Sequence, residues 1–271
     1  MSQTSAGHWS EISNKWALVG QPLRPSAEDI AAFQSVLDSE QPARGLILGV
    51  TPELYRLNWP GECDLVALDN NPKMIETVWV GGRDQVLLGD WRCMPLADES
   101  REVAFCDGGF HLLPHPDGQL RFIRSMRRVL ALGGVCAIRL FAPTSERESE
   151  ESVLADMAQG RVPNLNILKL RLGMAMQERP GEGVRLGDVW ERVAGLAGSF
   201  DELAESVGWP IEHLRAIDSY RGSDARYCFV TPSEVQDLFC KEVGGFRLES
   251  TIFPSYELGD RCPLVVYRKV G

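Results

Sequence analysis

The chain has 271 residues, of which 44% are hydrophobic and 24% charged, enough for one large domain or a domain with an inserted lobe. Its formal net charge of −10 argues against a protein that binds nucleic acid through a general excess of Lys and Arg. Seven scattered cysteines without a CxxC spacing indicate free thiols in a reducing compartment. Because it has neither a secretory leader pattern nor an apolar run of about 18 residues, we expect a cytoplasmic protein with no membrane partner.

The N-terminal residues are predicted to pack back on the body of the protein. Trp9 and Trp16 place aromatic rings in an otherwise polar leader. Arg24 lies in a proline turn, where it either faces a carboxylate or stays on the surface. Ser26 followed by Asp29 then predicts a capped helix, because the two side chains accept from each other's backbone amides.

Five short apolar runs alternate with helical segments over the next hundred residues, which predicts a parallel sheet covered by helices on both faces. Asn71 before Pro72 is typical of a helix start, and Asp117 is expected to cap a helix that runs through Leu130 and is ended by Gly133 and Gly134. The predicted strands are 45–48, 64–68, 85–88, 103–106 and 135–141.

From Pro143 to Arg226 the strand pattern stops and apolar residues repeat at helical spacing. A strand pattern then returns, with a capping box that begins at Thr231 and an antiparallel pair predicted over 246–253 and 264–267. We therefore expect an α/β protein with these parts: an N-terminal segment (1–44) over the ligand site, a Rossmann-like core (45–142 and 227–271), and a helical lid that binds the substrate (143–226).

Three of the first four predicted strands end in an aspartate: Asp69, Asp90 and Asp107. In an open α/β sheet the ligand lies beyond the carboxyl ends of the strands. A row of carboxylates there suits a ligand that presents ribose hydroxyls, an exocyclic amine and an ammonium group. The separation of about 20 residues between Gly49 and Asp69 is also typical of a nucleotide-binding unit.

The sequence resembles the class I S-adenosylmethionine-dependent methyltransferases, of the small-molecule type and with a variant glycine loop. The resembling segments are LILGVTPEL (46–54), LVALDNNPKMI (65–75), VLLGDWRCMPLADES (86–100), VAFCDGGFHLLPHPDG (103–118), MRRVLALGGVCAIRLF (126–141) and TPSEVQDLFCKEVGGFRLEST (231–251). This resemblance implies a seven-stranded Rossmann-like sheet with helices on both faces and its last strand antiparallel. It also implies S-adenosylmethionine as the cofactor and S-adenosylhomocysteine as the product.

The resemblance implies that the first glycine loop lies against the methionine part of the cofactor and that the end of the second strand binds the ribose. The residues concerned are Gly49, Val50 and Thr51 in the loop, and Asp69, Asn70 and Met74 at the ribose and adenine. The loop is bulkier than the family pattern, because Thr51 and Glu53 replace its second and third glycines.

By the same resemblance, Asp90 accepts from the adenine amine and Trp91 lies against the adenine ring. Asp107 and Gly108 lie beside the methionine part, near the transferred methyl group. The Thr51 hydroxyl and Arg24 are both expected to bind the carboxylate of the cofactor.

A general base is needed only if the acceptor must lose a proton. His111 and His115, just past the fourth strand, are the candidate bases, with packing or a helix start as the alternative for each. His213 and Tyr220 are candidate substrate contacts in the lobe. The scattered histidines predict no metal site, and the sequence leaves the acceptor atom and the oligomeric state open.

Two alternatives to a small-molecule methyltransferase stay open. The bulky loop at Thr51 and Glu53 is compatible with a catalytically silent cofactor-binding or scaffold protein. A nicotinamide-dependent oxidoreductase shares the spacing of Gly49 and Asp69, but the chain lacks its GxGxxG pattern.

Overall fold

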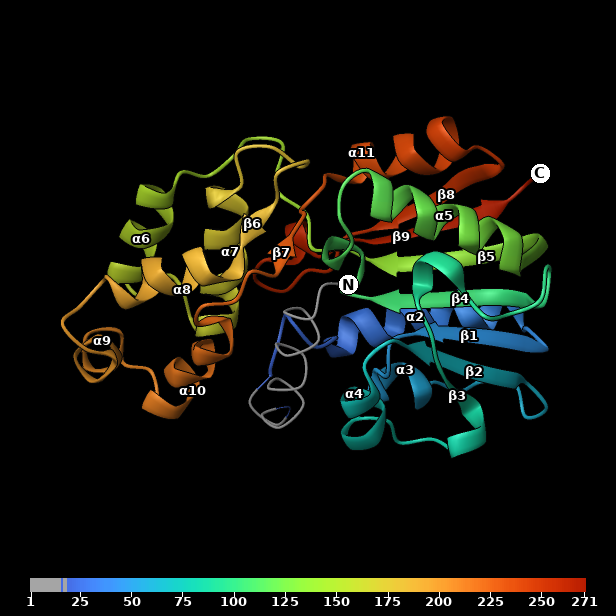
Figure 1. The fold of residues 1–271 in the computed structure, drawn as a ribbon, viewed down its shortest axis with the longest axis horizontal. Helices are drawn as coiled ribbons and strands as arrows, with labels where there is room; N and C mark the ends of the chain where they lie inside the picture. The colour runs from blue at the N-terminus through green and yellow to red at the C-terminus, as the bar shows by residue number, and fades with distance from the viewer. Residues whose placement is uncertain (1–15, 17–18) are drawn as a thin grey trace.

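The computed structural model describes Trp16 and residues 19–271, which form an α/β core and a helical lobe (Figure 1). The core sheet has seven strands in the order β3-β2-β1-β4-β5-β9-β8. The first five strands are parallel, and β9 runs antiparallel to both of its neighbours. This confirms the predicted Rossmann-like sheet. The predicted packing of Trp9 lies outside the described residues.

The strands of the sheet are short and apolar, as the sequence predicted. Leu46, Ile47 and Leu48 are all buried, because helices cover both faces of the sheet. The strand bounds are β1 (Arg44–Leu48), β2 (Asp64–Asp69), β3 (Val86–Leu88), β4 (Arg101–Asp107), β5 (Leu130–Arg139), β8 (Phe246–Ile252) and β9 (Leu264–Lys269).

Two helical layers sandwich the sheet (Figure 1). On one face, α2 (Ala27–Glu40) buries Phe33 and Leu37 against Phe105, and its predicted capping box at Ser26 is present. On the other face, α5 (Asp117–Val129) buries Phe122, and α11 (Pro232–Asp237) continues into a π-helical turn, Leu238–Val243. The remaining core helices are α3 (Pro52–Tyr55) and α4 (Pro72–Thr77).

The junction of α5 and β5 differs from the prediction. The helix begins at Asp117 itself, after Pro116, and no side chain caps it, so the predicted cap at Asp117 is wrong. The helix ends at Val129, before Gly133 and Gly134, so these glycines do not terminate it. The strand begins at Leu130, and Gly133 lies within it at a positive φ of 80°. The pairing of β4 with β5 shifts register between Arg101 and Val103, so the glycines belong to an irregular start of the strand rather than to a turn.

The helical lobe, defined as residues 143–226, follows β5 and therefore lies beyond the carboxyl ends of the parallel strands (Figure 1). It has an apolar core of its own, which includes Leu168, Val193 and Leu214. Its elements are α6 (Glu150–Ala158), α7 (Leu165–Met176), α8 (Leu186–Ala194), α9 (Phe200–Val207), α10 (Ile211–Arg215) and the two-stranded ribbon of β6 (Val184–Arg185) and β7 (Arg226–Tyr227).

Candidate active site

A pocket opens at the carboxyl edge of the sheet, where β1 and β4 adjoin and their neighbouring connections run in opposite directions. Three parts of the chain line it: the loops that follow the strands, the N-terminal residues Trp16, Val19 and 23–25, and the helical lobe. The segments that follow β1 and β2 contribute six of the residues predicted to bind the cofactor: Gly49, Val50, Thr51, Asp69, Asn70 and Met74.

The turn after β1 brings the backbone into the pocket at Gly49. This residue has a φ of 95°, which glycine adopts without the strain that a side chain would add. Its amide donates to the carbonyl of Leu68 over 2.8 Å, which ties the turn to the end of β2. A Cβ atom here would lie 4.0 Å from the Asp69 carboxylate and 3.7 Å from the Trp91 ring. The turn therefore aligns the first loop with the second strand end.

Asp69 ends β2 and is 9% exposed. One carboxylate oxygen accepts from the amide of Asn71 over 2.8 Å, and the Asn71 side chain in turn caps α4. Burial raises the pKa of Asp69 to about 6, although the amides of Asn70 and Asn71 partly oppose this. The carboxylate therefore enters the pocket with acceptor capacity left for hydroxyl donors.

Asp90 is turned away from the pocket. Its carboxylate caps the short turn Trp91–Cys93 and forms a forked pair with Arg92, with both carboxylate oxygens 3.0 Å from the guanidinium Nε. This hydrogen bonding lowers the pKa of Asp90. The residue lines only a small adjoining hollow with Asn70 and Leu113. The sequence analysis did not predict that Arg92 would form an ion pair with the Asp90 carboxylate.

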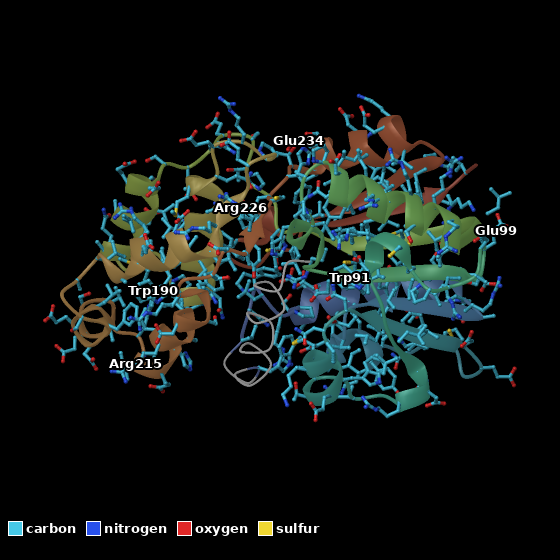
Figure 2. All side chains as sticks on the ribbon, in the orientation of Figure 1. Trp91, Glu99, Trp190, Arg215, Arg226 and Glu234 are labelled. Carbon is cyan, nitrogen blue, oxygen red and sulfur yellow. The ribbon has the colours of Figure 1, made fainter. Side chains whose placement is uncertain are left out.

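Trp91 does line the pocket, within the core (Figure 2). Its indole nitrogen donates to the carbonyl of Leu68 over 2.7 Å. The ring lies against Gly109, where an added Cβ atom would come within 2.8 Å of it. The tryptophan is therefore held in one orientation, between the ends of β2 and β4.

Asp107 and Gly108 both line the pocket, but the Asp107 carboxylate pairs with Arg139 of β5. The Arg139 side chain is fully buried and also donates to the carbonyl of Pro22 over 2.9 Å. Asp29, at the start of α2, lies 3.5 Å from the same guanidinium. Arg139 therefore links the N-terminal part of the chain to the sheet and holds the Asp107 carboxylate, while Gly108 lines the pocket.

Arg24 lines the pocket and faces a carboxylate within the protein, that of Glu53. Its Nε donates to Glu53 over 2.8 Å, and its guanidinium lies 5.5 Å from the centre of the Trp16 ring. Glu53 occupies the position where the resemblance places a third glycine. The unusual acidic residue in the loop is therefore neutralised by the arginine that was expected to bind the cofactor carboxylate.

The structure separates the two candidate bases. His111 lines the pocket, stacks on Phe229 with ring centres 5.4 Å apart, and meets the edge of Tyr227 at 4.5 Å. Burial lowers its pKa to about 3, so the ring is neutral and only weakly basic at physiological pH. His115 instead contacts Gln119 over 2.8 Å at the start of α5 and does not line the pocket. Neither environment favours a general base.

The two candidate substrate contacts in the lobe also differ. Tyr220 is buried and lines the pocket, whereas His213 is exposed on α10. The pocket also includes Lys169 and Tyr227, which sequence reasoning missed. A signal for Lys169 was present, because it lies four residues after Leu165 and therefore on the same face of α7 as that buried leucine.

Within the described part of the chain, no group of three or more His, Cys, Asp and Glu side chains is arranged to hold a metal ion. No helix among the described residues combines the length and apolar character needed to cross a membrane.

Comparison with known proteins assigns the domain. Residues 48–138, about a third of the chain, match a family model described as a methyltransferase domain. No curated protein sequence matched the chain. The matched segment runs from the end of β1 to β5 and therefore contains Gly49, Asp69 and Asp107.

Solved structures share the fold at low sequence identity. A protein from Rhodobacter sphaeroides, described as a candidate zinc-dependent alcohol dehydrogenase, has a TM-score of 0.66 at 14% identity over 99% of this chain and 100% of that chain. The N-methyltransferase NodS from Bradyrhizobium japonicum, in complex with S-adenosylhomocysteine, has a TM-score of 0.54 at 12% identity over 100% of both chains. A candidate O-methyltransferase from Nostoc punctiforme has a TM-score of 0.52 at 10% identity over 96% of this chain and 60% of that chain.

Identities this low establish the fold alone, so the family rests on the domain match combined with the strand order and the position of the pocket. The chain therefore contains a methyltransferase domain with a seven-stranded Rossmann-like fold.

Proposed function

We propose that the protein transfers the methyl group of S-adenosylmethionine to a small molecule bound between the core and the helical lobe. The observation that carries this proposal is one pocket lined both by the strand-end loops, with Gly49 and Asp69, and by the lobe, with Lys169 and Tyr220. A pocket shared in this way brings a cofactor and an acceptor together and suits a small molecule better than a polymer.

The described residues fit the cofactor at its ribose. Asp69 offers a buried carboxylate with one oxygen already oriented by the amide of Asn71, so the ribose hydroxyls are suitable donors to it. Met74 and Trp91 supply apolar surface for the adenine, and the backbone at Gly49 leaves room for the methionine part. When bound, the cofactor supplies an electrophilic methyl group on a sulfonium.

The chain itself orients the acceptor and excludes water. The helical lobe closes the pocket with Tyr220, and His111 presents a neutral ring to it. Since His111 is weakly basic and His115 lies outside the pocket, we infer that neither histidine takes a proton from the acceptor. The rate enhancement then rests on alignment of the acceptor and on removal of water.

The proposed compartment is the cytoplasm. All seven cysteines of the chain lie among the described residues and are free thiols. Free thiols persist where the environment is reducing.

Calorimetric titration with S-adenosylhomocysteine tests the ribose assignment. We expect Asp69→Ala to weaken binding by about 1–3 kcal/mol, because the ribose hydroxyls lose a charged acceptor. Asp38→Ala, an exposed position on α2, is the matched control and should bind like the unmodified protein. Failure of the unmodified protein to bind would contradict the proposed function, and equal affinity in Asp69→Ala would contradict the ribose assignment. Binding without turnover across a broad panel of acceptors would favour the silent scaffold instead.

A further inference from the structure

The side of the pocket formed by the lobe contains a lysine that has no acidic partner among the described residues. Lys169 of α7 lines the pocket, and its ammonium lies 5.2 Å from the centre of the Tyr220 ring. No ion pair joins it to any acidic side chain among the residues that the structure describes. A cation facing an apolar ring in this way keeps part of its charge uncompensated.

Two arginines at this site already have carboxylate partners. Arg24 lines the pocket and pairs with Glu53, and Arg139 pairs with the pocket residue Asp107. Among the described residues that line the pocket, Lys169 is therefore the charged basic side chain that forms no ion pair with a carboxylate. A ligand with a negative charge would find its counter-charge at this position.

Burial of the Lys169 ammonium favours its pairing with an anion. Loss of contact with water lowers the pKa of Lys169 to about 8, so about nine-tenths of the side chain is still protonated at pH 7. Taking a charged ammonium out of water is costly unless an anion pairs with it. His111 is neutral and therefore neither competes for an anion nor repels a cation.

An aromatic wall leads from this lysine toward the end of β4. Tyr220 meets Tyr227 with ring centres 6.2 Å apart, and Tyr227 meets His111 at 4.5 Å. His111 then contacts Phe141 at 5.2 Å, and the Phe141 ring lies so close to Gly108 that an added Cβ atom there would come within 2.8 Å. A flat, apolar ligand body suits a wall built of ring faces and edges.

We propose that the acceptor is a small aromatic monocarboxylic acid whose carboxylate pairs with Lys169 and whose ring lies along Tyr220, Tyr227 and His111. This identification of the substrate class rests on the proposed function. One ammonium without an acidic partner among the described residues matches a single negative charge, whereas a phosphate ester would call for additional donors. In this arrangement the acid group faces the lobe, and the atom to be methylated points toward the strand-end loops.

The test compares acids with their neutral amides. The probes are benzoate with benzamide, 4-hydroxybenzoate with 4-hydroxybenzamide, and 4-aminobenzoate with 4-aminobenzamide. Their affinities are measured by ligand-observed NMR at pH 7 with saturating S-adenosylhomocysteine. We expect the acids to bind at least about tenfold more tightly than the amides, as a charge-assisted hydrogen bond predicts.

The variants identify the source of this preference. Lys169→Met should bind acid and amide about equally, whereas Lys169→Arg should retain most of the preference, since it keeps the positive charge. Lys241→Met is the matched control, because Lys241 is exposed and pairs with Asp237 on α11. Thermal unfolding of every variant verifies that the comparison is made on folded protein.

Three results would overturn the inference: no benzoate binds, acids and amides bind alike, or Lys169→Met keeps the preference for acids. The affinity of each protein for S-adenosylhomocysteine is measured in parallel. If the unmodified protein binds that product while the acids fail, the substrate class is wrong and the proposed function stands. If it does not bind that product, the proposed function itself fails.

Discussion

Asp69 illustrates how a single residue can serve ligand binding at a cost to the fold. Its burial raises the pKa of the carboxyl to about 6 from an ordinary value of 3.8, so the folded protein holds this proton more tightly than the unfolded chain does. The neutral Asp69 carboxyl therefore contributes to the free energy of unfolding. This contribution is complete below about pH 4 and is lost as the pH rises through 6. At neutral pH the ionised carboxylate therefore destabilises the protein while it stands ready to accept from a ligand.

Asp69→Asn should therefore stabilise the ligand-free protein at about pH 8, by about 2 kcal/mol, and change its stability much less near pH 4. The amide keeps an oxygen that can accept from Asn71 but carries no charge. Urea unfolding of both proteins at the two pH values measures this. A variant that is less stable at pH 8, or a difference that does not vary with pH, would refute the assignment.

At the scale of single residues, prediction from the sequence worked where the backbone determines position. Gly49 and Asp69 lie on the pocket because a strand end and a glycine turn place them there. It did not foresee the ion pairs that two of the predicted carboxylates form inside the protein. Asp90 pairs with Arg92, and Asp107, which lines the pocket, pairs with Arg139 of the neighbouring strand. The roles of the pocket residues in binding remain predictions.

At the scale of elements, the capping boxes predicted at Ser26 and Thr231 are both present, whereas the predicted cap at Asp117 is not. The box that begins at Thr231 is present, with the Thr231 amide donating to the Glu234 carboxylate over 2.7 Å and the Glu234 amide donating back over 3.3 Å. Such reciprocal bonds involve residues only three apart, so tertiary packing has little opportunity to override them. The start of β5 was mispredicted because its two glycines continue the strand instead of ending the helix.

Thr231→Ala should lower the free energy of unfolding by about 1 kcal/mol, because the first turn of α11 loses its side-chain acceptor. Affinity for S-adenosylhomocysteine should not change, since Thr231 does not line the pocket. Chemical unfolding and calorimetry measure the two quantities. Gln236→Ala, exposed on the same helix, is the control and should alter neither. A stability equal to that of the control would argue against the cap.

For the whole molecule, the parallel direction of the first five strands was predictable and the contacts between the lobe and the core were not. Apolar runs that alternate with helices predict parallel strands, since parallel strands need crossover connections, but this alternation does not determine the strand order. The sequence of the lobe predicted its helices, but which face of α7 meets the core depends on contacts between distant segments. Lys169 was missed for this reason, although Tyr220 was identified as a possible contact. The division into segment, core and lid by function likewise remains a proposal.

The most direct test of the central claim is a crystal structure of the protein grown with S-adenosylhomocysteine. The account predicts that the product occupies the pocket between the strand-end loops and the helical lobe, with its ribose hydroxyls within hydrogen-bonding distance of the Asp69 carboxylate. Its sulfur should face the space between Gly108 and Tyr220, which leaves the aromatic wall free for an acceptor. A ligand bound elsewhere, or a ribose directed away from Asp69, would contradict it.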